Sequence, residues 1–363
     1  MKRKRIMVGA IICSIVMAFV LAFFAILPPG KGAVEPFRDG DGNIIPGSIA
    51  EKCRIETDSG ELGAFILGKN ADAPVLLVCG GGPGIPEYLM EHEYPSCLTD
   101  LFVVCYWDYR GTTLSYDAAL DPEDMTTERF IEDTNTVTEY LRDRFGQDKI
   151  YILGHSFGTY VALNTVSRYP ELYEAYFAMS QDCDQVESEY LAYDYMKNEY
   201  EKAGNKAMVR KFEKCPIRES DEFYDRYFSS SLRDKAMHEL GVGTTRDMRS
   251  VITGIFFPSL RIREYTQKER LHLWSGKIAS RAFAVTEEST HFNAFTDIPA
   301  VDVAMYFFAG EYDQTCSYSL QKEYYEQLSA PEKEFHTFAD SAHSPIYEES
   351  EAAAEILKEI LAK

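Results

Sequence analysis

Apolar and polar residues follow two different patterns along this chain. Several short runs are continuously apolar and rich in β-branched residues, among them 74–79 (PVLLVC), 101–107 (LFVVCYW) and 149–154 (KIYILG). Such runs are typical of strands that are buried on both faces of a sheet. Residues 126–145 instead have helical spacing behind a threonine start. Strands and helices that alternate in this order predict a mostly parallel sheet with helices on both faces.

The pattern changes between about residues 181 and 297. This stretch is helix-like, tyrosine-rich and charged, and a buried-strand run returns only at 301–310. An insertion between two sheet strands belongs at the edge where ligands bind in open α/β folds. We therefore predict an α/β core of residues 51–180 and 298–363, with residues 181–297 as a helical cap over the site. A separate domain with its own function is the alternative.

The N-terminal segment differs from the rest of the chain. Residues 2–5 are all basic, and the next 22 residues, 6–27, contain no charge. At about 1.5 Å per residue such a helix spans the ~30 Å hydrocarbon layer. The run is longer than the apolar region of most cleaved signals, so we predict that residues 1–27 are a single-pass membrane anchor. The basic tip predicts a cytoplasmic N-terminus and an extracellular domain, joined by a Gly- and Pro-rich stem at 28–50.

The charge of the chain argues against some partners. The net charge is −21, and removing the four basic residues at 2–5 leaves −25 for the remainder. Such a surface repels nucleic acid and anionic lipid head groups, so we expect no nucleic-acid partner. The eight cysteines include no CxxC pair and no metal-ligand spacing, so neither a metal nor another cofactor is expected. The sequence gives no oligomeric state.

One short motif points to catalysis. The sequence GHSFG at 154–158 follows a predicted strand and precedes a predicted helix, which is the context that the G-x-S-x-G motif requires. The two glycines permit a turn so tight that larger side chains would collide, and the strained turn presents the serine hydroxyl. We therefore predict that Ser156 is a nucleophile, which needs a base and a third group that orients the base.

The base and the acid follow the serine in chain order where this motif occurs. Of the seven histidines, two precede Ser156, three fall in the predicted cap and His336 lies in an alternating, strand-like run. His343, in the loop sequence ADSAHSP before the last helix, is therefore the predicted base. Asp313 follows the buried run 301–310 and is the predicted acid. An aspartate that only caps its own turn is the alternative for this residue.

A tetrahedral intermediate also needs hydrogen-bond donors for its negative charge. The backbone N–H of Phe157, directly after the serine, is one candidate. The other is Gly82 in the sequence GGGPG at 80–84, where glycines allow the backbone to approach a substrate closely. A phosphate-binding loop is the competing interpretation of these glycines, but the G-K-[ST] ending of that motif is missing.

Five motifs together resemble the α/β-hydrolase superfamily, and within it the prolyl iminopeptidase branch, over about residues 50–363. They are GGGPGIPEY at 80–88, DYRGTTLS at 108–115, GHSFGT at 154–159, GEYD at 310–313 and SAHSP at 341–345. The resemblance implies that Ser156, Asp313 and His343 correspond to the catalytic triad, and Gly82 with Phe157 to the oxyanion hole. It also implies an enzyme that removes an N-terminal proline or a similar residue from short peptides.

The chain departs from the branch at positions that line or support the pocket. Gly80 replaces a histidine, Tyr109 a glutamine, Thr113 a glycine and Phe157 a tryptophan. The reaction class is therefore better defined than the substrate, and an esterase acting on small or lipid-like acyl groups is the main alternative. A non-catalytic binding module is a third interpretation.

A peptidase of this kind must also bind the amine of its substrate. A buried amine needs a carboxylate partner, because an unpaired buried charge is costly. We expect that partner to come from the cap. The candidates are Glu187, Glu189, Glu264 and Glu287.

Overall fold

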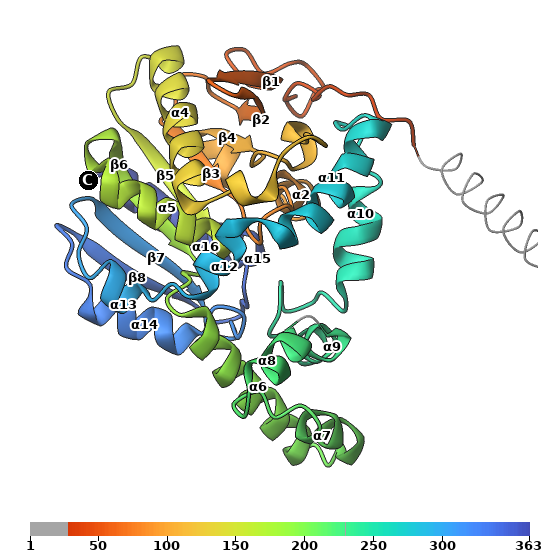
Figure 1. Cartoon of the computed structure of the whole chain (residues 1–363). Helices are drawn as coiled ribbons and strands as arrows, with labels where there is room; N and C mark the ends of the chain where they lie inside the picture. The colour runs from red at the N-terminus through yellow and green to blue at the C-terminus, as the bar shows by residue number, and fades with distance from the viewer. Residues whose placement is uncertain (1–27, 229) are drawn as a thin grey trace, which may run out of the picture.

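The computed structural model describes residues 28–228 and 230–363 (Figure 1). The predicted membrane anchor, residues 1–27, lies outside these residues. Among the helices that are described, none combines the length and the apolar character needed to cross a bilayer.

An eight-stranded sheet forms the centre of the molecule, with strand order β1-β2-β4-β3-β5-β6-β7-β8. β1 pairs with β2 and β2 with β4 in antiparallel fashion, and all other neighbours are parallel. The predicted mostly parallel sheet is confirmed. The strands are β1 (Ile49–Thr57), β2 (Gly60–Gly68), β3 (Val75–Cys79), β4 (Val103–Trp107), β5 (Ile150–His155), β6 (Tyr173–Met179), β7 (Ala304–Gly310) and β8 (Lys333–Phe338).

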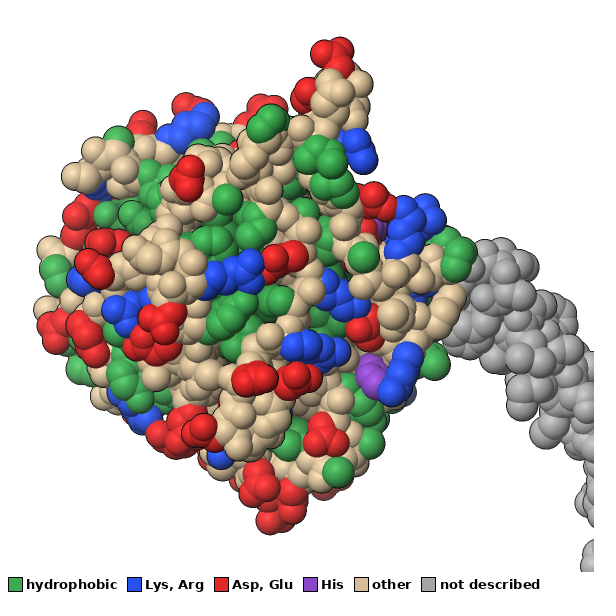
Figure 2. All heavy atoms as spheres, turned by 90° about the horizontal axis from the view of Figure 1, so that it is seen from above, with side chains coloured by type: hydrophobic (Ala, Val, Ile, Leu, Met, Phe, Trp, Pro, Cys, Tyr) green, Lys and Arg blue, Asp and Glu red, His purple; other side chains and the backbone are tan. Residues whose placement is uncertain are grey.

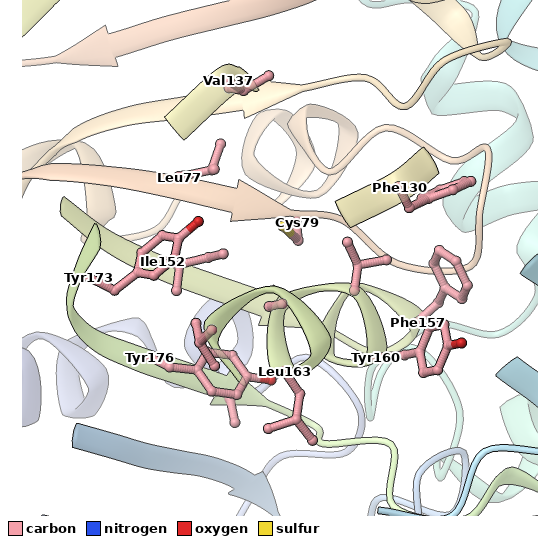
Figure 3. Packing of buried hydrophobic residues seen from close by; sticks show 14 of the residues in the cluster. Leu77, Cys79, Phe130, Val137, Ile152, Phe157, Tyr160, Leu163, Tyr173 and Tyr176 are labelled. Atoms are coloured by element: carbon pink, nitrogen blue, oxygen red, sulfur yellow. The ribbon is translucent and has the colours of Figure 1, made fainter. Parts of the chain in front are cut away.

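Helices cover both faces of this sheet, as the apolar runs predicted. Side chains alternate along β3: Leu77 and Cys79 join one hydrophobic cluster, and Leu76 and Val78 join the other. Figure 3 shows the first cluster, where Leu77 lies near Val137 of α4, and Phe130 of α4 lies near Phe157 of α5. The first face carries α4 (Thr127–Phe145), α5 (Phe157–Arg168) and α14 (Tyr318–Gln327), and the second carries α2 (Tyr88–Glu93), α3 (Leu98–Leu101), α15 (Pro345–Glu348) and α16 (Ser350–Leu361).

The described residues between β6 and β7 form helices and no strand. α6 to α9 enclose a hydrophobic cluster of their own, which includes Met196, Phe212 and Tyr227. The other helices of the insertion return to the core, where α12 lies against α4 and α11 against η1 (Thr113–Ser115). The inserted elements are α6 (Gln185–Lys202), α7 (Lys206–Glu213), α8 (Asp221–Phe228), α9 (Ser231–Leu240), η4 (Ile252–Phe256), α10 (Phe257–Ser259), α11 (Gln267–Ala279), η5 (Ser280–Ala282), α12 (Ala284–Thr290) and α13 (Ala294–Asp297). Two further short turns of helix, η2 (Pro122–Asp124) and η3 (Pro170–Leu172), lie outside the insertion, before α4 and before β6.

The stem was predicted as residues 28–50, but β1 already begins at Ile49. Residues 28–48 contain no helix and no strand of the sheet, and they pack against the insertion. The N–H groups of Lys31 and Gly32 donate to the Arg263 carbonyl over 2.6 and 3.2 Å. Gly30 passes so close to the insertion that a Cβ there would lie 2.0 Å from the backbone carbonyl oxygen of Tyr265. The glycines of the stem therefore permit close packing, and the stem is not a free tether.

A buried ion pair joins the β1–β2 turn, the loop after β4 and α4. Arg110, in the DYRG sequence after β4, donates to both carboxylate oxygens of Asp133 on α4, over 2.9 and 2.6 Å. The same guanidinium donates to the Ser59 carbonyl and the Thr57 hydroxyl in the β1–β2 turn. The pair therefore fixes the opening hairpin and α4 to the loop that follows β4.

Replacing Asp133 should reveal how much this pair stabilises the fold. Asp133→Ala leaves the buried Arg110 charge without its partner, and we expect the free energy of unfolding to fall by about 3 kcal/mol. Guanidinium unfolding of the full-length chain in detergent measures this. Glu132→Ala is the matched control, because Glu132 makes only an exposed ion pair with Arg129, and its loss should stay below about 0.5 kcal/mol. Equal losses in the two variants would contradict the assignment.

Candidate active site

Ser156 occupies a strained turn between β5 and α5. Its φ of 56° and ψ of −125° lie outside the regions that L-residues normally adopt. The turn is held because the Ser156 N–H donates to the Met179 carbonyl at the end of β6, over 3.2 Å. The Ser156 carbonyl accepts from the N–H and the hydroxyl of Thr159, over 2.7 and 2.6 Å. Ser156 is half-buried and directly follows the parallel strand β5, so it lies at the carboxyl edge of the sheet, where ligands bind in folds of this class.

The glycines on both sides of the serine are required by close packing. A Cβ on Gly154 would lie 2.7 Å from the Gly158 oxygen, and a Cβ on Gly158 would lie 1.9 Å from the Cys79 oxygen at the end of β3. Real Cβ atoms do not approach other atoms so closely. The close packing of β3, β5 and α5 therefore requires glycine at both positions, as the motif predicted.

His343 and Asp313 form a hydrogen-bonded pair beside this turn. His343 Nδ1 lies 3.0 Å from each carboxylate oxygen of Asp313. A carboxylate only accepts, so Nδ1 carries the proton and Nε2 is left to accept one. Asp313 is fully buried and also accepts from the N–H groups of Thr315 and Cys316 and from the Gln321 amide. Asp313 therefore caps its own turn and orients His343 at the same time.

The glycine loop after β3 lies directly against the serine. A Cβ on Gly81 would lie 3.3 Å from Ser156 Cβ, and the Gly81 N–H donates to Glu87 over 3.2 Å. Gly82 has a φ of 51°, which favours glycine. Phe157 is the first residue of α5, so its N–H has no acceptor within the helix. Gly82 and Phe157 therefore remain the candidate donors to an oxyanion.

A buried ion pair that the motifs did not predict lies behind the serine. His155 Nδ1 lies 2.8 Å from a Glu87 carboxylate oxygen, and His155 Nε2 lies 2.8 Å from the His343 carbonyl oxygen. Both partners accept, so an imidazole that makes both bonds donates from both nitrogens and is positively charged. Burial by itself lowers the pKa of His155, but the Glu87 carboxylate outweighs it and the pKa is raised. Burial likewise raises the pKa of Glu87, and the charge of His155 outweighs it, so that pKa is lowered.

The Glu87–His155 pair connects the three segments that carry the candidate site residues. Glu87 holds the glycine loop through Gly81, His155 directly precedes Ser156, and its ring holds the backbone of His343. The Ser180 hydroxyl donates to the same His343 carbonyl over 2.9 Å. The signal for this pair was present in the sequence, because both residues lie within recognised motifs, but nothing in the chain shows that they meet.

The structure separates the four glutamates that were predicted to bind an amine. Glu189 on α6 is fully buried, and Arg233 donates to both of its oxygens, with Nε at 2.9 and 2.8 Å. Glu187 is half-buried in the first turn of α6. Glu264 is half-buried, and its Oε2 lies 3.9 Å from His92 Nε2. Glu287 is exposed on α12. Of the four, only Glu189 is fully buried. It directly follows Ser188, whose hydroxyl accepts from the N–H of Ser317, in the loop after Asp313, over 3.3 Å.

Two further ionisable groups near the serine were not predicted. Asp182 follows β6 at the same edge of the sheet, and its Oδ1 has no hydrogen-bond partner among the described residues. Burial raises the pKa of Asp182 to about 7, and the nearby Asp184 and Glu189 add to this effect. Lys277 on α11 donates to the carbonyls of Gly82 and Pro83, and burial lowers its pKa to about 8. The position of Asp182 after a strand could have indicated it, whereas Lys277 depends on how the cap packs.

Comparisons with known proteins agree on one fold. A family model described as alpha/beta hydrolase fold matches residues 74–350. The probable aminopeptidase YbaC of Bacillus subtilis (strain 168) is 31% identical over 295 residues, which cover 81% of this chain and 90% of that protein. A proline iminopeptidase structure from Mycobacterium smegmatis aligns with a TM-score of 0.63 at 14% identity, covering 86% and 97% of the two chains. An esterase structure from Exiguobacterium antarcticum aligns with a TM-score of 0.53 at 14% identity, covering 85% and 99%. At these identities the two structures are similar in fold.

Replacing Glu87 should change how stability depends on pH. Because the pKa of His155 is raised in the folded protein, its protonated ring stabilises the fold fully at a pH below 6.5, the ordinary pKa of histidine. This contribution is lost as the pH rises through the pKa of the folded state. Because the pKa of Glu87 is lowered, its carboxylate stabilises the fold at a pH above 4.5, the ordinary pKa of glutamate. This contribution is lost as the pH falls through the pKa of the folded state. Glu87→Gln should therefore lower the free energy of unfolding by about 3 kcal/mol between these values, and by less at higher pH.

Guanidinium unfolding of the full-length chain at several pH values checks this. Glu93→Gln is the matched control, because Glu93 forms an exposed pair with His92 at 2.8 Å. The same loss at every pH, or the same profile in both variants, would show that the Glu87–His155 pair is not charged.

Proposed function

The chain belongs to the α/β-hydrolase fold family and is a hydrolase, and from this premise we propose that it is a serine hydrolase that cleaves an amide bond at the N-terminus of short peptides. The observation that carries the proposal is the pairing of His343 with buried Asp313 at the sheet edge where the strained Ser156 lies. A strained serine beside an oriented base is the arrangement that nucleophilic catalysis needs.

The proposed reaction proceeds through an acyl-enzyme. Ser156 Oγ attacks the scissile carbonyl carbon while His343 Nε2 accepts the hydroxyl proton, and Asp313 stabilises the imidazolium that forms. The N–H groups of Gly82 and Phe157 donate to the oxyanion. His343 then gives its proton to the departing amine. A water molecule, activated by the same histidine, attacks the ester carbonyl and restores Ser156.

The proposed preference for a peptide N-terminus rests on the carboxylates near the serine. The relative that is 31% identical is named a probable aminopeptidase. A protonated amine bound in a buried site needs a carboxylate, and Asp182 has a buried oxygen without a partner among the described residues. Burial is the main cause of the raised pKa of Asp182, and the charges of Asp184 and Glu189 add to it. We infer that Asp182, supported by Glu189, receives the amine.

An esterase is the second candidate function, and one contact favours it. Arg233 already neutralises Glu189 through both carboxylate oxygens, so this glutamate offers less charge to an amine than its burial suggests. A neutral acyl substrate needs no carboxylate at all. A non-catalytic binding module is disfavoured because the serine, the base and the acid are all present in the expected order.

We further propose that the enzyme is held at the cell membrane, with its N-terminus in the cytoplasm and the catalytic domain outside. The proposal is supported by the basic residues at 2–5 and the uncharged segment 6–27 that follows them.

Removing any member of the triad should abolish turnover without unfolding the protein. Ser156→Ala, His343→Ala and Asp313→Asn should each lower kcat for an aminoacyl arylamide by about 10³-fold or more, because the three groups act as a unit. Circular dichroism verifies the fold of each variant. Asp302→Asn is the matched control, since Asp302 is exposed before β7, and it should retain full activity. Near-normal turnover in Asp313→Asn would place the acid elsewhere.

Substrate preference should separate the two candidate functions. A peptidase should hydrolyse a free-amine prolyl or alanyl arylamide with a kcat/KM about 10²-fold above that of the N-acetyl compound, because only the free amine pairs with a carboxylate. Asp182→Asn keeps the shape of the side chain and should remove this preference, as should Glu189→Gln. Glu287→Gln is the control, because Glu287 is exposed. Equal or faster turnover of the blocked amide, or of a short acyl ester, would favour the esterase.

A further inference from the structure

An exposed apolar strip runs along the part of the insertion formed by η4, α10 and α11. Ile252, Leu271 and Ile278 are 57%, 51% and 68% exposed. Leu271, Trp274 and Ile278 stand at positions i, i+3 and i+7 of α11, so they share one side of the helix. The Phe256 ring lies 5.0 Å from the Trp274 ring and joins η4 to this strip. Single exposed apolar residues are normal, whereas three of these share one side of α11 and Phe256 joins η4 to them. We call the surface of Ile252, Phe256, Leu271, Trp274 and Ile278 the α10–α11 face.

Basic residues surround the α10–α11 face. Residues 246–281 contain eight Lys and Arg against three Asp and Glu, although the whole chain has a net charge of −21. Among the three acids, Glu269 is already paired with Lys52 of β1. The segment that carries the face is therefore basic, although the chain as a whole is acidic. The exposed basic residues are Arg249, Arg261, Arg263, Lys268 and Arg281.

The described chain begins beside this face. The Pro28 carbonyl accepts from Arg270 on α11 over 2.8 Å, and the Lys31 N–H donates to the Arg263 carbonyl over 2.6 Å. Figure 1 shows the start of the described chain next to α10 and α11, and Figure 2 shows Lys, Arg and hydrophobic side chains near the same place. The residue before Pro28 is the last of the uncharged segment 6–27. Anything that the segment enters must therefore lie close to α11.

We propose that the α10–α11 face lies on the surface of a lipid bilayer that contains anionic lipids. The inference rests on the membrane location proposed above. Apolar side chains on a helix with a basic rim are suited to the interface between acyl chains and anionic head groups. Because Pro28 directly follows residue 27, the membrane segment would hold the face near the bilayer. The high effective concentration would allow the face to bind lipid even if its own affinity is weak.

The charges disfavour the other occupants of the face. A second copy of the chain that docked through the same face would bring two basic rims together. Residues 6–27 contain no acidic side chain to meet the basic rim. Anionic head groups supply the charge that both of these occupants lack.

Docking in this way would bring the bilayer close to the proposed oxyanion hole. Lys277 of α11 donates to the Gly82 carbonyl, and the Ser280 hydroxyl after α11 donates to the Pro83 carbonyl over 2.6 Å. One helix therefore carries both the lipid-facing side chains and the contacts to the glycine loop.

The two tryptophans of the chain allow a direct test. Trp274 belongs to the α10–α11 face, and Trp107 is buried in β4 with 3% exposure. We would reconstitute the full-length protein in nanodiscs that contain phosphatidylglycerol, with or without brominated acyl chains, which quench tryptophans that they contact. In Trp107→Phe, bromination should lower the Trp274 emission about twofold. In Trp274→Phe, the Trp107 emission should stay unchanged. If Trp107→Phe fails to fold, the difference between the wild type and Trp274→Phe gives the same quantity.

The charge of the face supplies a second arm. Arg261→Glu, Arg263→Glu and Lys268→Glu together should at least halve the quenching, whereas the control combination Arg210→Glu, Lys211→Glu and Lys322→Glu on α7 and α14 should leave it unchanged. Ser156→Ala should be quenched like the wild type, so the result does not depend on the proposed catalysis. Trp274 emission that ignores bromination would overturn the proposal. So would emission that changes with the number of protein copies per disc and not with bromination, because a second copy would then cover the face.

Discussion

The buried ion pair of Glu87 and His155 is the contact on which the geometry of the site depends. The glycine loop follows β3, the serine follows β5 and the histidine loop follows β8, so a parallel sheet brings all three to one edge. The sheet sets the edge but not the alignment within it. Two buried charges tolerate only an arrangement in which each is paired and hydrogen-bonded, and in this arrangement the pair holds Gly81, Ser156 and His343 in fixed relation.

Much of the fold follows from local patterns. Strands buried on both faces must be continuously apolar, and the glycines of the serine turn are dictated by backbone contacts within the motif. The boundaries were harder to predict. The apolar run at 101–107 was expected to be one strand, but Leu101 ends α3 and β4 begins at Val103. An apolar run looks the same in a buried helical turn as in a buried strand, so periodicity alone did not separate the two.

Contacts between distant parts of the chain were not predictable in the same way. Chain order indicated Asp313 and His343, but no pattern in the chain indicates that Glu87 and His155, which are 68 positions apart, form a pair. The pairing of Glu189 with Arg233 likewise depends on how α6 meets α9. Net charge suggested a surface that repels anionic lipids, yet folding gathers basic side chains around the α10–α11 face. The two ion pairs are set by packing, whereas the excess of Lys and Arg at 246–281 was present in the sequence and was masked by the net charge of −21.

The central claim is that Ser156 is the nucleophile of a hydrolase. The most direct measurement treats the full-length protein with a fluorophosphonate, which reacts with activated serines, and locates the adduct by peptide mass spectrometry. The account predicts one adduct, on Ser156, that forms in the wild type and is absent when His343 is replaced by alanine. An adduct on another residue, or no adduct on the folded wild type, would contradict it.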